Sequence, residues 1–201
     1  MSRENHAKFL DRLRPHMSEE DLVRTDCAYI QTKYGHRNQS RDSGERYFEH
    51  PRAVALIVID ELGIYDPEII QACLMHDMLE DSYLLDELRM KFFASQTTVD
   101  IVVGTSMPPI DKEKFPSKQA RLDYYHDQIK NASFRVKLVK LADRLHNCRT
   151  LNGCTLEKRR RKTEETILHY LPLIKDIHKE EPDIANIFER EFELAIVNLE
   201  L

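Results

Sequence analysis

The sequence predicts an all-α protein, a bundle of about eight to ten helices that forms one domain over residues 1–201. Two observations favour this class. Only 5 glycines and 8 prolines occur in 201 residues, and 32% of the residues are charged, which suits a helical protein better than a β-sandwich or a disordered chain. In several segments, helix start and stop signals also bracket apolar residues at helical spacing.

Such signals divide the first half of the chain. A Ser or Asp side chain accepts hydrogen bonds at a helix start, Pro suits the first helical position, and Gly favours a helix end. The signals are Pro15, Ser18 with Asp21, Pro51, Gly63, and Asp66 with Pro67. They predict helices over residues 2–14, 18–34, 52–62 and 67–81. Near-helical spacing of Leu84, Leu85, Leu88 and Phe92 predicts another helix over 82–94.

In the second half, residues 97–105 are rich in Val, Ile and Thr, a composition that permits a strand. Residues 104–117 form a long loop, which could be a lid or specificity element, or simply a variable surface loop. Helices are expected over 118–131, after Ser133, around residue 163 with a kink at Pro172, and after Pro182. The apolar residues of the last helix could belong to the core or to a dimer face.

An acidic hexad, His76-Asp77-Met78-Leu79-Glu80-Asp81, follows the apolar run 68–75, so we interpret it as a continuation of that helix. Residues three and four apart share a helix face, which places His76 beside Glu80, and Asp77 beside both Glu80 and Asp81. Two negative charges about 4 Å apart repel by roughly 4 kcal/mol at an effective dielectric near 20. A divalent cation would offset this repulsion, although these acids could equally face water.

Two further stretches bear on how the hexad is interpreted, one over residues 41–51 and one over residues 137–147. In chain order the three stretches contain R-x-S-G-x-x-Y-x-x-H-P, H-D-x-x-E-D and K-L-A-D-R-L-H-N. Together they resemble the HD-domain hydrolases of the RelA/SpoT type, which remove the 3′-pyrophosphate from the alarmone guanosine tetraphosphate (ppGpp). The resemblance covers about Tyr34 to Leu151 and implies an HD-domain bundle in which residues 97–105 are helical.

This resemblance implies one divalent metal ion, held by His50, His76, Asp77 and Asp143. The family implies Mn²⁺, whereas two histidines and two aspartates fit any first-row divalent ion, Fe and Zn included. The resemblance also implies that Glu80 and Asp81 act as catalytic residues on the attacking water. His146 matches a position outside the metal set, and we expect it to be structural.

The same resemblance places the nucleotide against Arg41. A planar guanidinium suits a guanine face or a phosphate group. Substrate-binding roles are also expected for Lys140, Arg144 and Asn147. The sequence departs from the family at Asp42 and Arg46, where Lys and Pro are usual, and the second change could alter the local loop shape.

Composition bounds the partners and the compartment. The net charge of −5 argues against a general nucleic-acid binder, yet residues 137–162 carry nine Lys or Arg against two acids. The basic run 158–162 is typical of a solvated face, with phosphate binding as the alternative. Four cysteines without a C-x-x-C pair, a polar start and no long apolar run predict a cytoplasmic protein that contacts no membrane. A homo-oligomer is possible.

We therefore expect metal-dependent hydrolysis of ppGpp or pppGpp to GDP or GTP and pyrophosphate. We expect no alarmone synthesis, because only about 50 residues follow the last motif. The alternatives are another nucleotide substrate, such as NADPH or a nucleoside triphosphate, or a non-catalytic alarmone sensor. A sensor should lack a metal ligand or the Glu-Asp pair, and all six residues are present.

Overall fold

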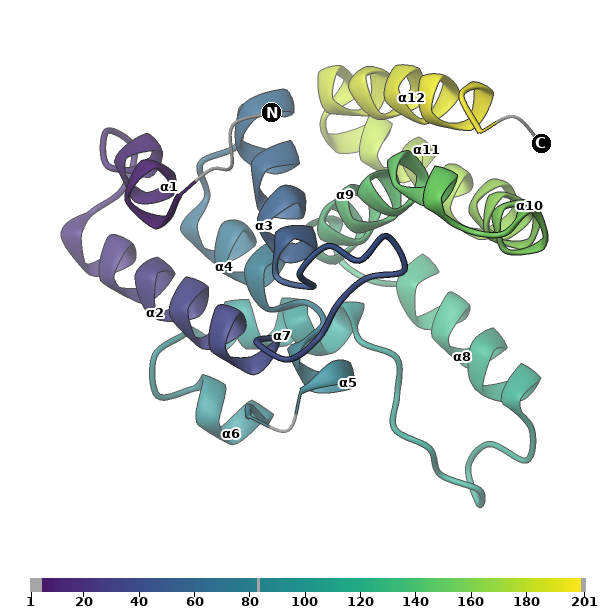
Figure 1. The fold of residues 1–201 in the computed structure, drawn as a ribbon, viewed down its shortest axis with the longest axis horizontal. Helices are drawn as coiled ribbons and strands as arrows, with labels where there is room; N and C mark the ends of the chain where they lie inside the picture. The colour runs from purple at the N-terminus through teal and green to yellow at the C-terminus, as the bar shows by residue number, and fades with distance from the viewer. Residues whose placement is uncertain (1–4, 83, 200–201) are drawn as a thin grey trace.

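A computed structural model describes residues 5–82 and 84–199 and is helical along its length (Figure 1). These residues form twelve α-helical segments, ten of them eight residues or longer, and their only β feature is an isolated bridge between Ser40 and Arg46. The prediction of an all-α bundle with about eight to ten helices is confirmed. In the same part of the chain, no helix is both long and apolar enough to cross a bilayer.

The helices are α1 (His6–Leu13), α2 (Glu19–Gly35), α3 (Glu49–Leu56), α4 (Pro67–Met75), α5 (Met78–Asp81), α6 (Glu87–Met90), α7 (Gln96–Thr105), α8 (Lys118–Lys130), α9 (Phe134–Arg149), α10 (Leu156–Glu165), α11 (Leu171–Glu180) and α12 (Pro182–Val197). Two π-helical turns, η1 (Ile57–Glu61) and η3 (Thr166–Tyr170), follow α3 and join α10 to α11. A 3₁₀ turn, η2 (Leu151–Gly153), follows α9.

Helix α9 is the centre of the bundle. It packs against α3, α4 and α7, and also against α11 and α12 (Figure 1). Leu138, Leu141 and Leu145 on this helix have no exposed surface, because a helix with apolar residues on several faces is enclosed by its neighbours. Its polar residues Lys140, Asp143 and Arg144 are buried as well, and buried charges need partners. These partners form the site described below.

Side-chain caps fix where several helices begin. Ser18 accepts a hydrogen bond from the Asp21 N–H at 3.1 Å, and Asp66 accepts one from Glu68 N–H at 2.9 Å. Ser133 caps α9 in the same manner. Each satisfies a backbone donor that would otherwise lack a partner. The predicted starts of these three helices are therefore confirmed, and so is the helical state of residues 97–105, which belong to α7.

The acidic hexad is not a continuous helix, contrary to prediction. Helix α4 ends at Met75 and α5 begins at Met78. Asp77 lies between them at φ −94° and ψ −3°, and its carbonyl accepts hydrogen bonds from the Glu80 and Asp81 N–H groups. A new turn thus starts at Asp77, and the predicted pairing of His76 with Glu80 loses its basis. His76 is 1% exposed, while Glu80 is solvent-accessible.

The predicted helix over 82–94 is also wrong. Ser82 is extended, and its hydroxyl oxygen accepts the Leu84 N–H, which ends α5. Asp86 then caps the four-residue α6 by accepting the Arg89 N–H. The apolar spacing was misleading, since Leu88 is 69% exposed and Phe92 81% exposed. Residue 83 lies outside the described residues, as do residues 2–4 of the first predicted helix.

The structure modifies the predictions made from two prolines. Pro51 occupies the third helical position of α3 rather than the first, so His50 lies inside the first turn. A proline in the first turn costs no helical hydrogen bond, so the helix tolerates this shift. The interruption expected at Pro172 takes the form of the π-helical turn η3, after which Leu171 and Pro172 begin α11.

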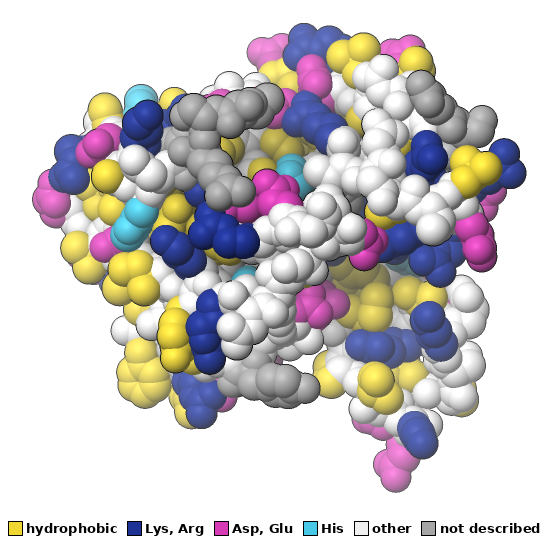
Figure 2. All heavy atoms as spheres, in the orientation of Figure 1, with side chains coloured by type: hydrophobic (Ala, Val, Ile, Leu, Met, Phe, Trp, Pro, Cys, Tyr) yellow, Lys and Arg dark blue, Asp and Glu magenta, His cyan; other side chains and the backbone are white. Residues whose placement is uncertain are grey.

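Charges of both signs are interspersed over the face drawn in Figure 2. That face has no single continuous basic surface. The basic bias of residues 137–162 is therefore a local property, and part of it points into the cavity described next.

Candidate active site

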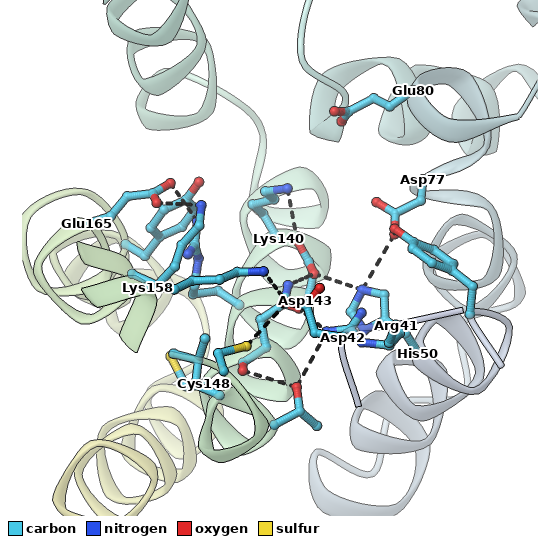
Figure 3. Close-up of a pocket in the computed structure, with 18 of the residues that line it drawn as sticks. Arg41, Asp42, His50, Asp77, Glu80, Lys140, Asp143, Cys148, Lys158 and Glu165 are labelled. Carbon is cyan, nitrogen blue, oxygen red and sulfur yellow. Dashed lines mark hydrogen bonds and ion pairs between the residues drawn. The ribbon is translucent and has the colours of Figure 1, made fainter. Parts of the chain in front are cut away.

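A cavity of about 240 Å³ opens between α9, α10, the start of α3 and the turn around Asp77. Figure 3 shows Asp77 and Glu80 on one side of it and Lys158 and Glu165 on the other. Eight of the ten predicted site residues line this cavity: Arg41, His50, Asp77, Glu80, Lys140, Asp143, Arg144 and Asn147. His76 and Asp81 do not line it, although each contacts a residue that does.

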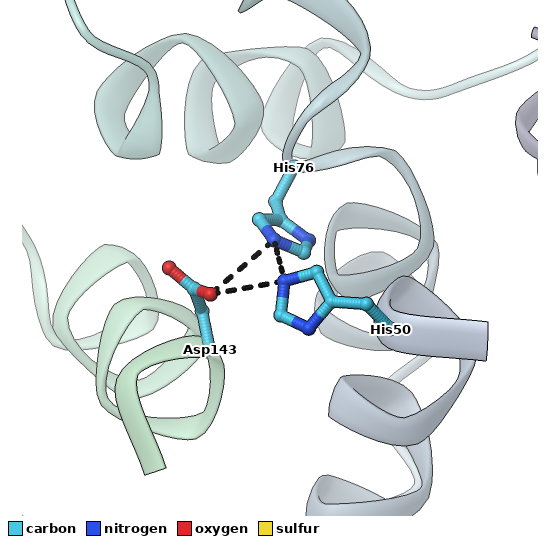
Figure 4. Close-up of side chains that lie close together, drawn as sticks. All are labelled: His50, His76 and Asp143. Atoms are coloured by element: carbon cyan, nitrogen blue, oxygen red, sulfur yellow. Dashed lines mark hydrogen bonds and ion pairs between the residues drawn. The ribbon is translucent and has the colours of Figure 1, made fainter. Parts of the chain in front are cut away.

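Three predicted metal ligands lie close together, with their side chains pointing toward one another (Figure 4). His50 Nε2 lies 3.2 Å from His76 Nε2 and 3.2 Å from Asp143 Oδ1, and His76 Nε2 lies 3.6 Å from the same oxygen. All three side chains are buried. Neighbouring ligands about 2.1 Å from a metal ion lie about 3.0–3.4 Å apart, so this spacing suits one divalent ion.

Hydrogen bonds on the far side orient both imidazoles. His76 Nδ1 lies 2.8 Å from the Cys73 carbonyl oxygen, which can only accept, so Nδ1 carries the proton. His50 Nδ1 lies 2.8 Å from His146 Nδ1, and in the tautomer in which His50 donates, its Nε2 is unprotonated too. Two nitrogen lone pairs then face one another beside a carboxylate. That donor set fits a cation, and such hydrogen-bond partners are typical of metal-binding histidines.

The local charges favour a cation at His76, whereas burial lowers the pKa of His50. Burial alone lowers the pKa of His76, yet the carboxylates of Asp77 and Asp143 outweigh it and hold that pKa well above its ordinary value. A positive charge at Nε2 is therefore stabilised, and either a proton or a metal ion can supply it.

Asp77 contacts this cluster from one side. Its Oδ1 lies 3.2 Å from His76 Nε2, and its Oδ2 lies 3.5 Å from His50 Nε2. Burial raises the pKa of Asp77, but the two histidines lower it well below its ordinary value. The tight three-residue group does not include Asp77. Its role as a fourth ligand therefore stays a prediction.

Tyr47 belongs to the first motif, where the sequence suggested no role for it. Its hydroxyl lies 2.8 Å from Asp77 Oδ2 and 2.8 Å from Asp81 Oδ2. One hydroxyl proton serves two carboxylates, so Tyr47 couples the predicted metal ligand to the predicted catalytic acid. Its ring stacks on His36, with centroids 4.6 Å apart, which fixes the hydroxyl in place.

We predict that Tyr47→Phe lowers kcat about 10- to 100-fold, the worth of a hydrogen bond to a charged group. The ring and its stacking remain, so KM and bound metal should change little. The measurements are steady-state kinetics and metal content by mass spectrometry. Tyr29→Phe, which changes a buried tyrosine outside the cavity, is the control. Loss of metal with unchanged kcat per bound ion would contradict this assignment.

Glu80 is held at the cavity mouth by the backbone. The Met107 N–H donates to Glu80 Oε1 at 2.9 Å. Protein surrounds most of the carboxylate although solvent reaches it, and this partial burial raises its pKa, with Lys140 and the Met107 N–H opposing the rise. A carboxylate with a raised pKa is suited to general acid–base work near neutral pH. Of the loop 106–117, only Met107 lines the cavity.

Lys140 and Arg144 lie deeper in the wall, each already paired with a carboxylate. Lys140 Nζ lies 2.9 Å from Asp143 Oδ2, and Arg144 donates to Glu165 Oε1 at 2.8 Å. Glu165 also accepts from Lys162. Burial raises the pKa of Glu165, but Arg144 and Lys162 lower it to about 2. These basic side chains are therefore held in fixed positions in the wall by their carboxylate partners.

Arg41 reaches the cluster through Asn147. Arg41 Nη2 donates to Asn147 Oδ1 at 2.7 Å, and Asn147 Nδ2 donates to Asp143 Oδ1 at 2.6 Å. Residues 106 positions apart in sequence thus meet in one chain of hydrogen bonds. Asp42, which stands where the family usually has Lys, pairs with Lys158 at the cavity rim.

The structure divides the basic run 158–162. Lys158 and Lys162 line the cavity, whereas Arg160 and Arg161 line a separate surface hollow and Arg159 donates to the Leu199 carbonyl oxygen. Spacing of four residues on α10 puts the two lysines on one face. The interpretation from sequence covered the whole run and so did not single out Lys158 and Lys162. Their spacing of four residues was the signal that could have identified them.

A family model described as an HD domain matches residues 27–175, which include every one of these site residues. The chain belongs to the HD domain family. This family implies a divalent metal, and the His50, His76 and Asp143 cluster is where the described residues could hold one.

Relatives with curated names match most of this chain. A guanosine-3′,5′-bis(diphosphate) 3′-pyrophosphohydrolase from Haemophilus influenzae is 42% identical over 142 residues, which is 69% of this chain and 20% of the relative. The bifunctional (p)ppGpp synthase/hydrolase SpoT from Escherichia coli is 36% identical over 164 residues, 80% of this chain and 23% of that protein. This chain thus spans about a quarter or less of these relatives.

A solved structure also matches this HD domain. It is described as a metazoan ortholog of SpoT that hydrolyses ppGpp and plays a role in starvation responses. The match has a TM-score of 0.69 and covers 89% of this chain and 97% of the other, at 22% identity. At that identity the likeness concerns the fold.

Proposed function

We propose that this protein hydrolyses the 3′-pyrophosphate of ppGpp or pppGpp in the cytoplasm. Water replaces the ribose 3′-oxygen at the phosphorus, and the products are pyrophosphate and GDP or GTP. The observation that carries the proposal is the buried His50, His76 and Asp143 cluster, beside a cavity lined by five Lys or Arg and five Asp or Glu side chains. The names of the HD relatives add the nucleotide.

His50, His76, Asp143 and Asp77 would hold the metal ion. Bound there, a divalent ion lowers the pKa of a coordinated water and polarises a phosphoryl oxygen. We propose Mn²⁺ because the resemblance to RelA/SpoT-type hydrolases implies it, and the donor set of two imidazoles and two carboxylates also accepts Fe or Zn. Metal analysis of the protein after purification without added metal tests the choice of ion.

The surrounding residues would divide the remaining work. Glu80 would take the proton of the attacking water, with Asp81 held nearby by Tyr47. Lys140, Arg144, Lys158 and Lys162 would bind the substrate phosphates, and Arg41 with Asn147 would bind the nucleoside. Such fixed charges lower the barrier by stabilising the negative charge that develops on the transferring group.

A nucleotide panel tests the function. Purified protein with Mn²⁺ should release pyrophosphate from ppGpp or pppGpp, with nucleotide products identified by chromatography. Turnover of NADPH or GTP in preference to these would identify a different phosphohydrolase. Tight binding of ppGpp without turnover under any divalent metal would instead indicate a sensor.

We predict that Arg41→Ala raises KM for ppGpp by about 10- to 100-fold, the loss of one charge-assisted contact. kcat and bound metal should stay within about twofold to threefold. Because Arg41 contacts Asn147, which contacts Asp143, metal content is the critical second measurement. Arg37→Ala in the same loop, whose guanidinium lies over Tyr34, is the control. Loss of metal in the Arg41 variant would make Arg41 a structural support instead.

A further inference from the structure

An apolar groove of about 480 Å³ lies at the far edge of the molecule, between η3, α11 and α12. These elements pack together away from α1 and α2 (Figure 1). Ile174 and Phe192 form its buried floor, and Ile167 and Val197 stand at its sides with 52% and 73% of their surfaces exposed. Exposed aliphatic residues that line a concave apolar surface are typical of an interface.

The rim of this groove carries charges of both signs. Lys175 comes from α11, and Glu189 and Glu193 come from α12. Asp176 and Glu191 on the same two helices, by contrast, are each paired with two basic side chains. Within the described residues, Lys175, Glu189 and Glu193 make no ion pair. A charged, unsatisfied rim around an apolar centre is the usual anatomy of an interface between proteins.

We propose that this groove binds a second copy of the same chain, with the two copies related by a twofold axis. In such an interface each patch faces its own counterpart, so the patch must be complementary to itself. This one is. A groove lies directly beside the protruding Val197, and a positive residue and two negative residues share one rim. A twofold rotation can set Val197 of each copy into the groove of the other, and Lys175 opposite Glu189 and Glu193.

A partner of one charge would leave half of this rim unsatisfied, which is why the mixed rim favours a second copy. The groove is also separate from the cavity, since the two share no lining residue. The proposal therefore goes beyond the proposed hydrolysis. Substitutions at the groove should leave the active site intact.

The first test is the mass in solution. The chain has a mass of 23.7 kDa, and sedimentation velocity over roughly 1–100 µM should show a species of twice that mass with a micromolar Kd. Val197→Glu should raise this Kd at least tenfold. Phe92→Glu, which changes an exposed apolar residue that does not line the groove, should leave it unchanged. Circular dichroism melting confirms that each variant is folded without relying on activity.

The second test uses the charges. Lys175→Glu sets like charges together in a homodimer, and so does the double variant Glu189→Lys, Glu193→Lys. Each should sediment as a monomer at concentrations where the unmodified chain is dimeric, while an equimolar mixture should restore the dimer through opposite charges. A monomeric unmodified chain, as expected if another segment or partner fills the groove, would overturn the proposal. So would a dimer that ignores Val197→Glu, or a mixture that stays monomeric.

Discussion

Asp143→Asn should abolish hydrolysis of ppGpp and leave the protein with little bound metal. Asp143 Oδ1 faces both Nε2 atoms, at 3.2 Å from His50 and 3.6 Å from His76, and Oδ2 faces Lys140 at 2.9 Å. An amide has the same shape but no charge, and its NH₂ group would point a donor at either the metal ion or Lys140. Neither arrangement replaces the carboxylate.

The same substitution should lower stability in the metal-free protein. Burial raises the pKa of Asp143, but Lys140 and the two histidines lower it well below its ordinary value. A lowered carboxylate pKa contributes stability above the unfolded pKa near 4, and that stability is lost as the pH falls through the folded pKa. Asn removes this contribution at neutral pH and leaves Lys140 buried without its partner, which costs about 3–5 kcal/mol.

Metal content by mass spectrometry, turnover at ordinary Mn²⁺ concentrations and thermal melting together test this prediction. Asp77→Asn should also purify with little metal if Asp77 is the fourth ligand. Asp123→Asn, which changes an exposed acid on α8, is the control and should match the unmodified protein in all three measurements. An Asp143 variant that melts normally and retains its metal would remove Asp143 from the ligand set.

Capping residues made much of this fold predictable. Ser18, Asp66 and Ser133 each accept a hydrogen bond from a backbone N–H in the first turn of a helix. Such a cap can be recognised from the neighbouring residues alone. The elements that failed depend on tertiary contacts. Leu88 and Phe92 have helical spacing but stay exposed, so the apolar periodicity there did not indicate a buried helix face.

The hexad shows a different limit. Its residue types indicate metal chemistry, but its geometry depends on where the backbone turns. The break at Asp77 directs His76 inward to His50 and sends Glu80 toward Met107. A continuous helix would have kept His76 and Glu80 on one face. Three of the predicted ligands thus converge despite the incorrect local structure, because the cluster is assembled by three separate helical segments.

Long-range proximity was visible only through the resemblance. Arg41 and Asn147 are far apart in sequence, and neither residue type indicates that they meet. Tyr47 lacked a predicted role for a similar reason, since a tyrosine in a motif is as often packing as chemistry. Its two carboxylate contacts are a property of the folded chain.

Glu80→Gln should lower turnover by about 10²- to 10⁴-fold, the usual contribution of a general acid–base group, while bound metal stays normal. Glutamine keeps the shape and can still accept the Met107 N–H, which donates to Oε1 at 2.9 Å. It cannot accept the proton of the attacking water. The loss should therefore appear in kcat, with KM nearly unchanged.

Stability gives this prediction a second, independent readout. Partial burial raises the pKa of Glu80 in the folded protein, so the folded state binds the carboxyl proton more tightly than the unfolded state does. The stability of the fold therefore falls as the pH rises from the unfolded pKa, near 4.3, through the folded pKa. At higher pH the carboxylate is ionised in the folded protein, and its partly buried charge destabilises the fold. Glu80→Gln removes the charge, so at neutral pH the variant should melt at the same temperature as the unmodified protein or higher. Glu87→Gln, an exposed glutamate on α6, is the matched control for activity and melting. If Glu80→Gln instead loses metal as completely as Asp143→Asn, Glu80 is a metal ligand and the division between ligands and proton carriers fails.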